Sequence, residues 1–248
     1  MGNGRSSGLP KGVKNRTLSL KDRISNLVVR AQATGYTLKT NYIDTTARAE
    51  AVDTYFAELD SYTAALGIPN LSNDVTGTLS VYKFPSKSTL GDASPEGDIR
   101  MAFKYIEDLD DMRDTLPHEY THQLVNYLIT KELGYAKNSR EYNSAYHNAD
   151  IYKMINTKAL ADFQDYLRSQ GKEDLAVKID TPYKAAKQSD MRDYATRDYG
   201  WAPKGAGIEI PTVAAENFVK VRYDWNKLKQ RHAYSYFVLK ELARLVNK

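Results

Sequence analysis

The chain of 248 residues contains no cysteine. This absence excludes a disulfide framework, a zinc finger built on thiolates and a catalytic cysteine. Any transition-metal site must therefore use histidine and carboxylate ligands, and histidine is itself scarce, with four residues. Hydrophobic residues make up 42% of the chain and charged residues 27%, a composition that is typical of a folded globular protein and excludes a largely disordered one.

Long apolar runs are also absent. No segment approaches the ~18 consecutive apolar residues of a membrane span. The opening residues, MGNGRSSGLPKG, lack the apolar region of a secretory signal. We therefore expect neither a signal peptide nor a membrane span.

The net charge of +4 is distributed unevenly. Residues 1–30 carry +6, so the rest of the chain sums to −2. The seven basic residues of that segment are Arg5, Lys11, Lys14, Arg16, Lys21, Arg23 and Arg30. We interpret residues 1–16 as a flexible basic arm and residues 17–248 as one domain. Such an arm could contact an acidic partner or nucleic acid, although a solvated tail is the more ordinary interpretation.

Hydrophobic periodicity predicts an α+β protein that is mostly helical. Helical spacing indicates helices over about 18–33, 44–66, 114–133, 142–169 and 212–246, with irregular chain over 171–211. Alternating residues predict two strands, over 78–84 and 99–105. The N-terminal part, 17–135, would hold the small sheet, and 136–248 would be helical.

Residues 117–123 read PHEYTHQ and contain the pattern H-E-x-x-H. On a helix, His118 and His122 project from one face, so both imidazoles can bind one metal ion. Glu119 lies alongside, where it can contact a water on the metal. Asp114 or Thr115 could cap this helix, and Pro117 is acceptable only within its first turn.

With this motif and the strands before it, the chain resembles the zincin metallopeptidases. The resemblance implies a zinc site on the motif helix, a small sheet packed against that helix, and an edge strand that binds extended peptide. We expect Ile99–Tyr105 to be that edge strand. The metzincin branch is excluded, because Gln123–Leu133 offers neither glycine in the required place nor a third histidine.

The segment Ala215-Glu216-Asn217-Phe218 is similar to a pattern in small phage-associated gluzincins, where a glutamate on a later helix is the third ligand. The resemblance therefore implies His118, His122 and Glu216 as ligands of Zn²⁺. It also favours a cytoplasmic or virion-associated protein. Other candidates for the third ligand remain: His147, His232, Glu141 and Asp193.

The resemblance implies a mechanism in which Glu119, as general base, deprotonates a zinc-bound water that attacks a peptide carbonyl. Tyr194 or Tyr199 could donate to the oxyanion. Asp190, Asp193 or Asn217 could orient the imidazoles. Two aromatic groups remain ambiguous. Tyr194, Tyr199, Trp201, Tyr223 and Trp225 could line a groove or form core, and Tyr142, Tyr146 and Tyr152 are interpreted as a packing stripe.

The sequence supports a zinc-dependent endopeptidase acting on a peptide or protein. One alternative is a catalytically inactive zincin-like structural or virion-associated interaction protein, whose metal only braces the fold. Another is nucleic-acid binding through residues 1–30.

Overall fold

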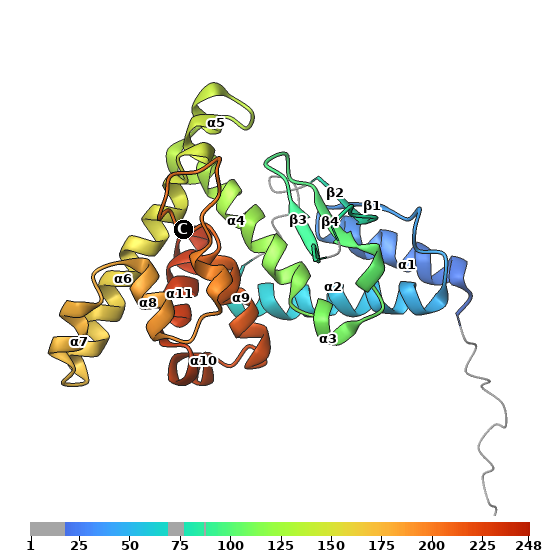
Figure 1. Cartoon of the computed structure of the whole chain (residues 1–248). Helices are drawn as coiled ribbons and strands as arrows, with labels where there is room; N and C mark the ends of the chain where they lie inside the picture. Colours follow the sequence, from blue (N-terminus) through green and yellow to red (C-terminus); the bar gives the residue numbers. More distant parts are fainter. Residues whose placement is uncertain (1–17, 69–76, 87) are drawn as a thin grey trace, which may run out of the picture.

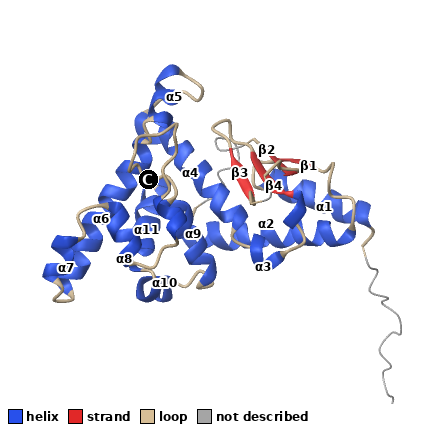
Figure 2. Ribbon diagram, viewed as in Figure 1, coloured by secondary structure: helices blue, strands red, loops and turns tan. Residues whose placement is uncertain are grey.

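A computed structural model describes residues 18–68, 77–86 and 88–248. The predicted basic arm lies outside these residues. The described chain is mostly helical and contains one four-stranded sheet, which confirms the α+β class (Figure 2). No helix in the described segments combines the length and the apolar character that crossing a bilayer requires.

Two helices at the N-terminal end follow the sequence prediction closely. Helix α1 spans Leu20–Ala33, and the Ser19 side chain accepts a hydrogen bond from a backbone N–H of its first turn. Helix α2 spans Thr46–Leu66, with Thr45 as its N-cap. Gly67 ends α2 with φ 66°, a left-handed conformation that glycine adopts without steric cost.

The sheet has the strand order β1-β2-β4-β3. Its strands are β1 (Thr37–Lys39), β2 (Thr78–Tyr82), β3 (Gly91–Ala93) and β4 (Ile99–Ala102). The first three in spatial order are parallel, and β3 runs antiparallel to β4. Alternate residues of β2 and β4 (Leu79, Val81, Ile99 and Met101) are buried, which gives the sheet one face in the core.

The predicted edge strand was wrong. Strand β4 is paired on both sides, with β2 and with β3, so it is interior. The edge beside the motif helix is β3, a segment over which the sequence predicted no strand. The chain after β4 also leaves the sheet early, as a 3₁₀ turn over Phe103–Tyr105.

The motif helix α4 spans Thr115–Leu133 and ends at Gly134, which has φ 71°. Pro117 is its third residue, where a missing N–H breaks no helical hydrogen bond, as predicted. Helix α4 follows the short helix α3 (Leu109–Met112) and lies between the sheet with α2 on one side and the C-terminal helices on the other (Figure 1).

The C-terminal part is helical but more divided than the sequence predicted. The single helix expected over 142–169 is two, because Ala149 takes φ 54° between them. Three helices replace the one expected over 212–246, and two short helices lie within 171–211. The bounds are α5 (Arg140–His147), α6 (Asp150–Ser169), α7 (Glu173–Lys178), α8 (Pro182–Gln188), α9 (Ile210–Lys220), α10 (Trp225–Arg231) and α11 (Ala233–Asn247).

A buried hydrogen bond joins α2 to the motif helix. The Thr121 hydroxyl donates to the carbonyl of Pro117 (2.7 Å), so the Tyr62 hydroxyl, 2.8 Å away, must be the donor to Thr121. We expect Tyr62→Phe to lower the free energy of unfolding by about 1 kcal/mol in denaturant titrations. Tyr135→Phe is the control, because Tyr135 is exposed. Equal effects of the two variants would contradict this role for Tyr62.

Candidate metal centre

The motif residues converge on one face of α4. His118 and Glu119 are buried and His122 is partly buried. Ligand atoms of these three residues lie within 4.8 Å of one another, a grouping that could hold a metal ion. The close spacing follows from the helix, which brings residues i and i+4 to the same face. This part of the sequence prediction is confirmed.

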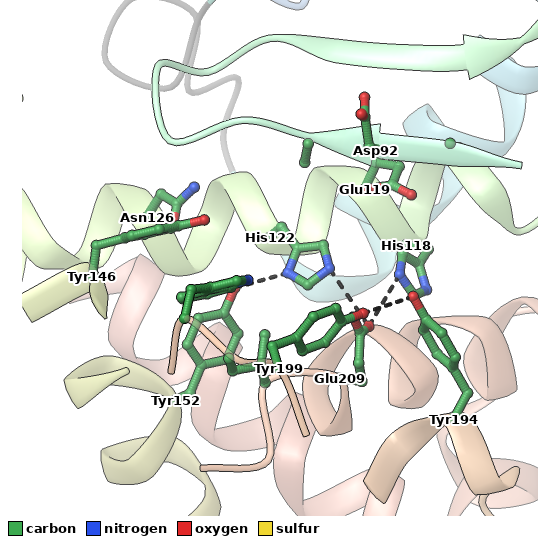
Figure 3. Close-up of a pocket in the computed structure, with 14 residues that line it drawn as sticks. Asp92, His118, Glu119, His122, Asn126, Tyr146, Tyr152, Tyr194, Tyr199 and Glu209 are labelled. Carbon is green, nitrogen blue, oxygen red and sulfur yellow. Dashed lines mark hydrogen bonds and ion pairs between the residues drawn. The ribbon is translucent and has the colours of Figure 1, made fainter. Parts of the chain in front are cut away.

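A carboxylate that the sequence did not single out faces both imidazoles. Oε2 of Glu209 lies 3.3 Å from Nε2 of His118 and 3.6 Å from Nε2 of His122 (Figure 3). Ligands that bind Zn²⁺ tetrahedrally at bond lengths of roughly 2.0–2.1 Å are about 3.3 Å apart. Glu209 therefore lies within ion-pair distance of both imidazoles and is a further candidate ligand for a metal ion held by His118 and His122.

Glu216 occupies a different position from the one the sequence predicted. Its Oε1 lies 2.7 Å from Nδ1 of His118, on the side of the ring opposite to Glu209. Nδ1 of His122 is likewise engaged, by the Tyr152 hydroxyl at 2.8 Å. Because both Nδ1 atoms have hydrogen-bond partners, both Nε2 atoms are left free to bind a metal. Metal-binding histidines are commonly oriented by such a hydrogen bond at their second ring nitrogen. Glu216 thus contacts His118 at Nδ1, where it can orient the ring, and its role as a ligand stays a prediction beside the second candidate, Glu209.

Several contacts fix the carboxylate of Glu209. The Thr212 hydroxyl lies 2.8 Å from Oε2, and the Tyr199 hydroxyl donates to Oε1. Just upstream, Gly207 has φ 67°, and its carbonyl accepts a hydrogen bond of 2.9 Å from Nδ2 of Asn156 on α6. The loop before α9 is therefore tied to α6 where it delivers Glu209.

The imidazoles and the carboxylates of the centre shift one another's pKa values. Burial alone would lower the pKa of His118, but hydrogen bonds to Glu209 and Glu216 raise it well above its usual value. Burial opposes ionisation of Glu209 too, yet the charge of His122 and the hydrogen bond from His118 bring the pKa of Glu209 well below its usual range. The lowered pKa keeps the carboxylate of Glu209 charged, and the raised pKa of His118 favours a proton on that imidazole.

Glu119 lies against the edge strand. A side chain at Gly91 would place its Cβ 2.9 Å from Oε1 of Glu119 and 2.8 Å from Thr115, so only glycine permits this approach. Burial raises the pKa of Glu119. The carboxylate of Glu119 forms no ion pair with either Nε2 atom, whereas Glu209 lies close to both. Glu119 is therefore free to accept a proton.

The aromatic residues of the C-terminal part divide into two groups. Tyr194, Tyr199 and Trp201 line the cavity at the motif, and the Tyr194 hydroxyl lies 2.9 Å from that of Tyr199. Tyr223 and Trp225 instead bond to α2, through Glu58 and the carbonyl of Ala65. Tyr194 therefore lies near the centre as expected, and its role as oxyanion donor stays a prediction.

Tyr142 and Tyr152 are buried in the hydrophobic core and Tyr146 packs against it, which confirms the packing stripe. Tyr146 and Tyr152 also line the cavity, where Tyr152 contacts His122 and Tyr146 stacks on Trp201. The residues expected to orient the imidazoles lie elsewhere: Asn217 bonds Ser235, and Asp190 and Asp193 are exposed.

The rival third ligands also lie away from both Nε2 atoms. His147 and Glu141 are exposed on α5, Asp193 is exposed in the 3₁₀ turn Asp193–Thr196, and His232 faces the carbonyl of Ser189.

The centre opens into two adjoining cavities. One, of about 190 Å³, extends past His122 towards Trp201, Tyr146 and Asn126. The other, of about 660 Å³, extends past His118 and is bordered by charged side chains: Asp110, Asp114, Arg192, Arg197, Glu216 and Lys220. Gly91, His118, Glu119 and Tyr194 line both. The two cavities therefore meet at β3 and the motif residues.

No family model, no curated protein and no solved structure matches this chain. The argument for function therefore depends on the geometry of the centre.

Replacing each glutamate by glutamine tests which one is a ligand, because both changes remove one buried charge at constant size. We expect Glu209→Gln to weaken Zn²⁺ binding more than about 100-fold, and Glu216→Gln to weaken it roughly 10- to 100-fold, as loss of an orienting group does. Competition with a chromogenic chelator measures both affinities, and circular dichroism checks the fold. A larger loss in Glu216→Gln would restore Glu216 as the ligand.

Proposed function

We propose that this protein is a zinc-dependent metallopeptidase. The observation that carries the proposal is the placement of Glu209 opposite two imidazole Nε2 atoms, with Glu119 beside them at the edge of a sheet. Two imidazoles and one carboxylate are the protein ligands of many catalytic zinc sites, which keep one open position. Zn²⁺ bound there would supply Lewis acidity and would lower the pKa of a water molecule towards neutrality.

Glu119 is the general base in this proposal. It is buried, it lies beside the ligands without pairing with them, and burial raises its pKa, which makes the carboxylate a stronger base. It would take a proton from the attacking water and deliver it to the leaving amine. Tyr194, whose hydroxyl points into the cavity in Figure 3, is the candidate donor to the developing oxyanion.

The edge strand β3 supports a peptide as substrate. Its ladder to β4 uses the carbonyl of Leu90, which accepts from Ala102 N–H at 2.8 Å, and the N–H of Ser94, which donates to Asp98 at 2.9 Å. Hydrogen-bonded pairs alternate along an antiparallel ladder, so the N–H and C=O groups of Gly91 and Ala93 point away from β4. Both residues line the cavity, where an extended peptide can pair with them.

Removal of the base tests catalysis. We expect Glu119→Gln to slow hydrolysis of a quenched fluorogenic peptide pool by roughly 10²- to 10⁴-fold. The variant should retain one zinc ion per chain by elemental analysis, because Glu119 is not a ligand in this proposal. Unchanged activity in Glu119→Gln would exclude the peptidase. A stable zinc site in a wild-type protein that cleaves nothing would instead favour a metal that only braces the fold.

A proline at the edge strand tests substrate pairing. Ala93→Pro removes an outward N–H while leaving the pairs of β3 with β4 intact, and proline is tolerated on edge strands. We expect KM for a peptide to rise several-fold, with zinc content unchanged. The matched control is Ala93→Ser, which keeps the N–H. An unchanged KM in Ala93→Pro would show that peptides do not pair with β3.

A further inference from the structure

Positive charge is concentrated in one folded segment, residues 220–240, which runs from the end of α9 through α10 into α11. The whole chain has 35 basic and 31 acidic residues, whereas this segment has six basic residues and one acidic residue, Asp224. Its net charge of +5 and the +6 of residues 1–30 leave −7 for the remaining 197 residues. The segment is therefore a basic part of an otherwise acidic folded domain.

Most cations of this segment are exposed and have no partner of opposite charge. They are Lys220, Arg222, Lys227, Lys229, Arg231 and Lys240. Lys229 is half-buried, and the other five are exposed. Arg222 lies 3.6 Å from an oxygen of Glu58, and Lys227 lies 3.5 Å from one of Asp224. No carboxylate of the described residues comes within ion-pair distance of the other four cations. Charges that the protein itself does not offset act on an outside partner.

The cations lie close together across neighbouring helices. The ammonium of Lys229 is 5.2 Å and that of Lys240 is 5.7 Å from the centre of the Tyr236 ring, so the two ammonium groups are less than about 11 Å apart. Lys240 also lies 4.0 Å from the ring centre of Trp225, the first residue of α10. Lys227 and Arg231 follow on α10, four residues apart and therefore on the same face. Figure 1 shows α10 at the margin of the molecule, beside α9 and α11.

The aromatic rings between these cations are covered. Trp225 and Tyr236 pack edge to face with their ring centroids 5.7 Å apart, and the lysines lie over the same rings. Lysines therefore occupy ring faces on which nucleobases would stack. The segment, which the structure describes in full, exposes no large hydrophobic side chain, so it lacks the apolar anchors of a membrane-bound helix. These observations favour a partner that is recognised by its charge alone.

We propose that these six cations form a basic surface that binds the phosphate backbone of double-stranded nucleic acid. Each strand of a duplex carries one phosphate charge per ~3.4 Å of its axis, so cations spaced from one helical turn to about 11 Å apart each meet a phosphate. The bound cations release condensed counterions, which supplies affinity without reading the base sequence. No metal and no hydrolysis enter this proposal, so it stands apart from the proposed peptidase.

Removal of three exposed charges tests the basic surface. The triple variant Lys227→Gln, Arg231→Gln and Lys240→Gln is compared with the wild type as full-length protein. Fluorescence anisotropy with labelled DNA and RNA duplexes of about 20 base pairs measures Kd over a range of salt concentrations. We expect the affinity at ~100 mM salt to fall at least about 30-fold. The slope of log K against log salt concentration should become shallower by about 2 to 3, since each lost phosphate contact removes ~0.9.

A matched control changes the net charge by the same amount elsewhere. The triple variant Lys153→Gln, Lys172→Gln and Lys178→Gln replaces three exposed lysines of α6 and the α7 region, outside the basic surface. It should bind the duplexes nearly as tightly as the wild type. The N-terminal basic residues are present in every protein compared, so the difference between the two triple variants reports the basic surface. Equal losses in both variants would show that only net charge matters and would overturn the proposal.

Tryptophan fluorescence locates the bound duplex. Trp201→Phe leaves Trp225 as the single tryptophan, since the sequence contains two. Because the Lys240 ammonium lies over the Trp225 ring, we expect duplex binding to change the emission of Trp225, and Lys240→Gln to reduce that change. Binding that leaves the Trp225 emission unaltered would place the duplex elsewhere on the chain and overturn the assignment.

Poly-L-glutamate is the competitor that distinguishes nucleic acid from an acidic protein. We expect it to displace the duplexes only at a much higher concentration of charge, because its carboxylates lie on a flexible chain of lower charge density. Displacement at equal charge concentration would identify the surface as one for acidic proteins and overturn the proposal, as would the absence of any saturable binding. Circular dichroism checks that each variant is folded. None of these outcomes bears on zinc binding or on the effect of Glu119→Gln.

Discussion

The arrangement of the centre depends on how buried negative charge is compensated. Glu119, Glu209 and Glu216 are all buried around two imidazoles, and Arg192 is the basic side chain that pairs with one of them. Isolated buried carboxylates are strongly unfavourable unless they are paired. The raised pKa of His118 and the lowered pKa of Glu209 correspond to one form of compensation, an ion pair between a protonated imidazole and a carboxylate. In the proposed metallopeptidase, a divalent cation opposite Glu209 would take the place of that proton.

This charge requirement connects distant parts of the chain. His118 and His122 come from α4, whereas Glu209 comes from the loop before α9 and Tyr152 from α6. The loop is held by Asn156 and by the left-handed turn at Gly207, so the candidate ligand Glu209 is in place only when α6 and α9 have packed on α4. In the proposed metallopeptidase, metal affinity and folding of the C-terminal helices would therefore be linked, as in other sites whose ligands converge only in the folded state.

The sequence predicted what local geometry determines. The motif, the first turn at Pro117 and the glycine stop of α4 all follow from helical spacing and backbone preferences. The sequence also singled out Glu216, as a metal ligand implied by a resemblance, but the imidazole nitrogen that Glu216 faces depends on how α9 packs on α4. Glu209 was not predicted as a candidate ligand, because it lies just before its helix and outside the helical pattern. Its place between two apolar residues, Ile208 and Ile210, nevertheless indicates a buried carboxylate. Strand β3 has three residues, too few for alternation to be recognised.

The direction of α4 explains why the two cavities differ. Residues at its beginning, such as Asp114 and Thr115, border the larger cavity with its charged side chains, and Asn126 further along borders the aromatic one. Strand β3 lies beside the same helix, so a peptide paired with it would pass from one environment to the other while crossing the centre. In the proposed peptidase, the two sides of the scissile bond would thus meet different surroundings: charged side chains near His118 and aromatic side chains near His122.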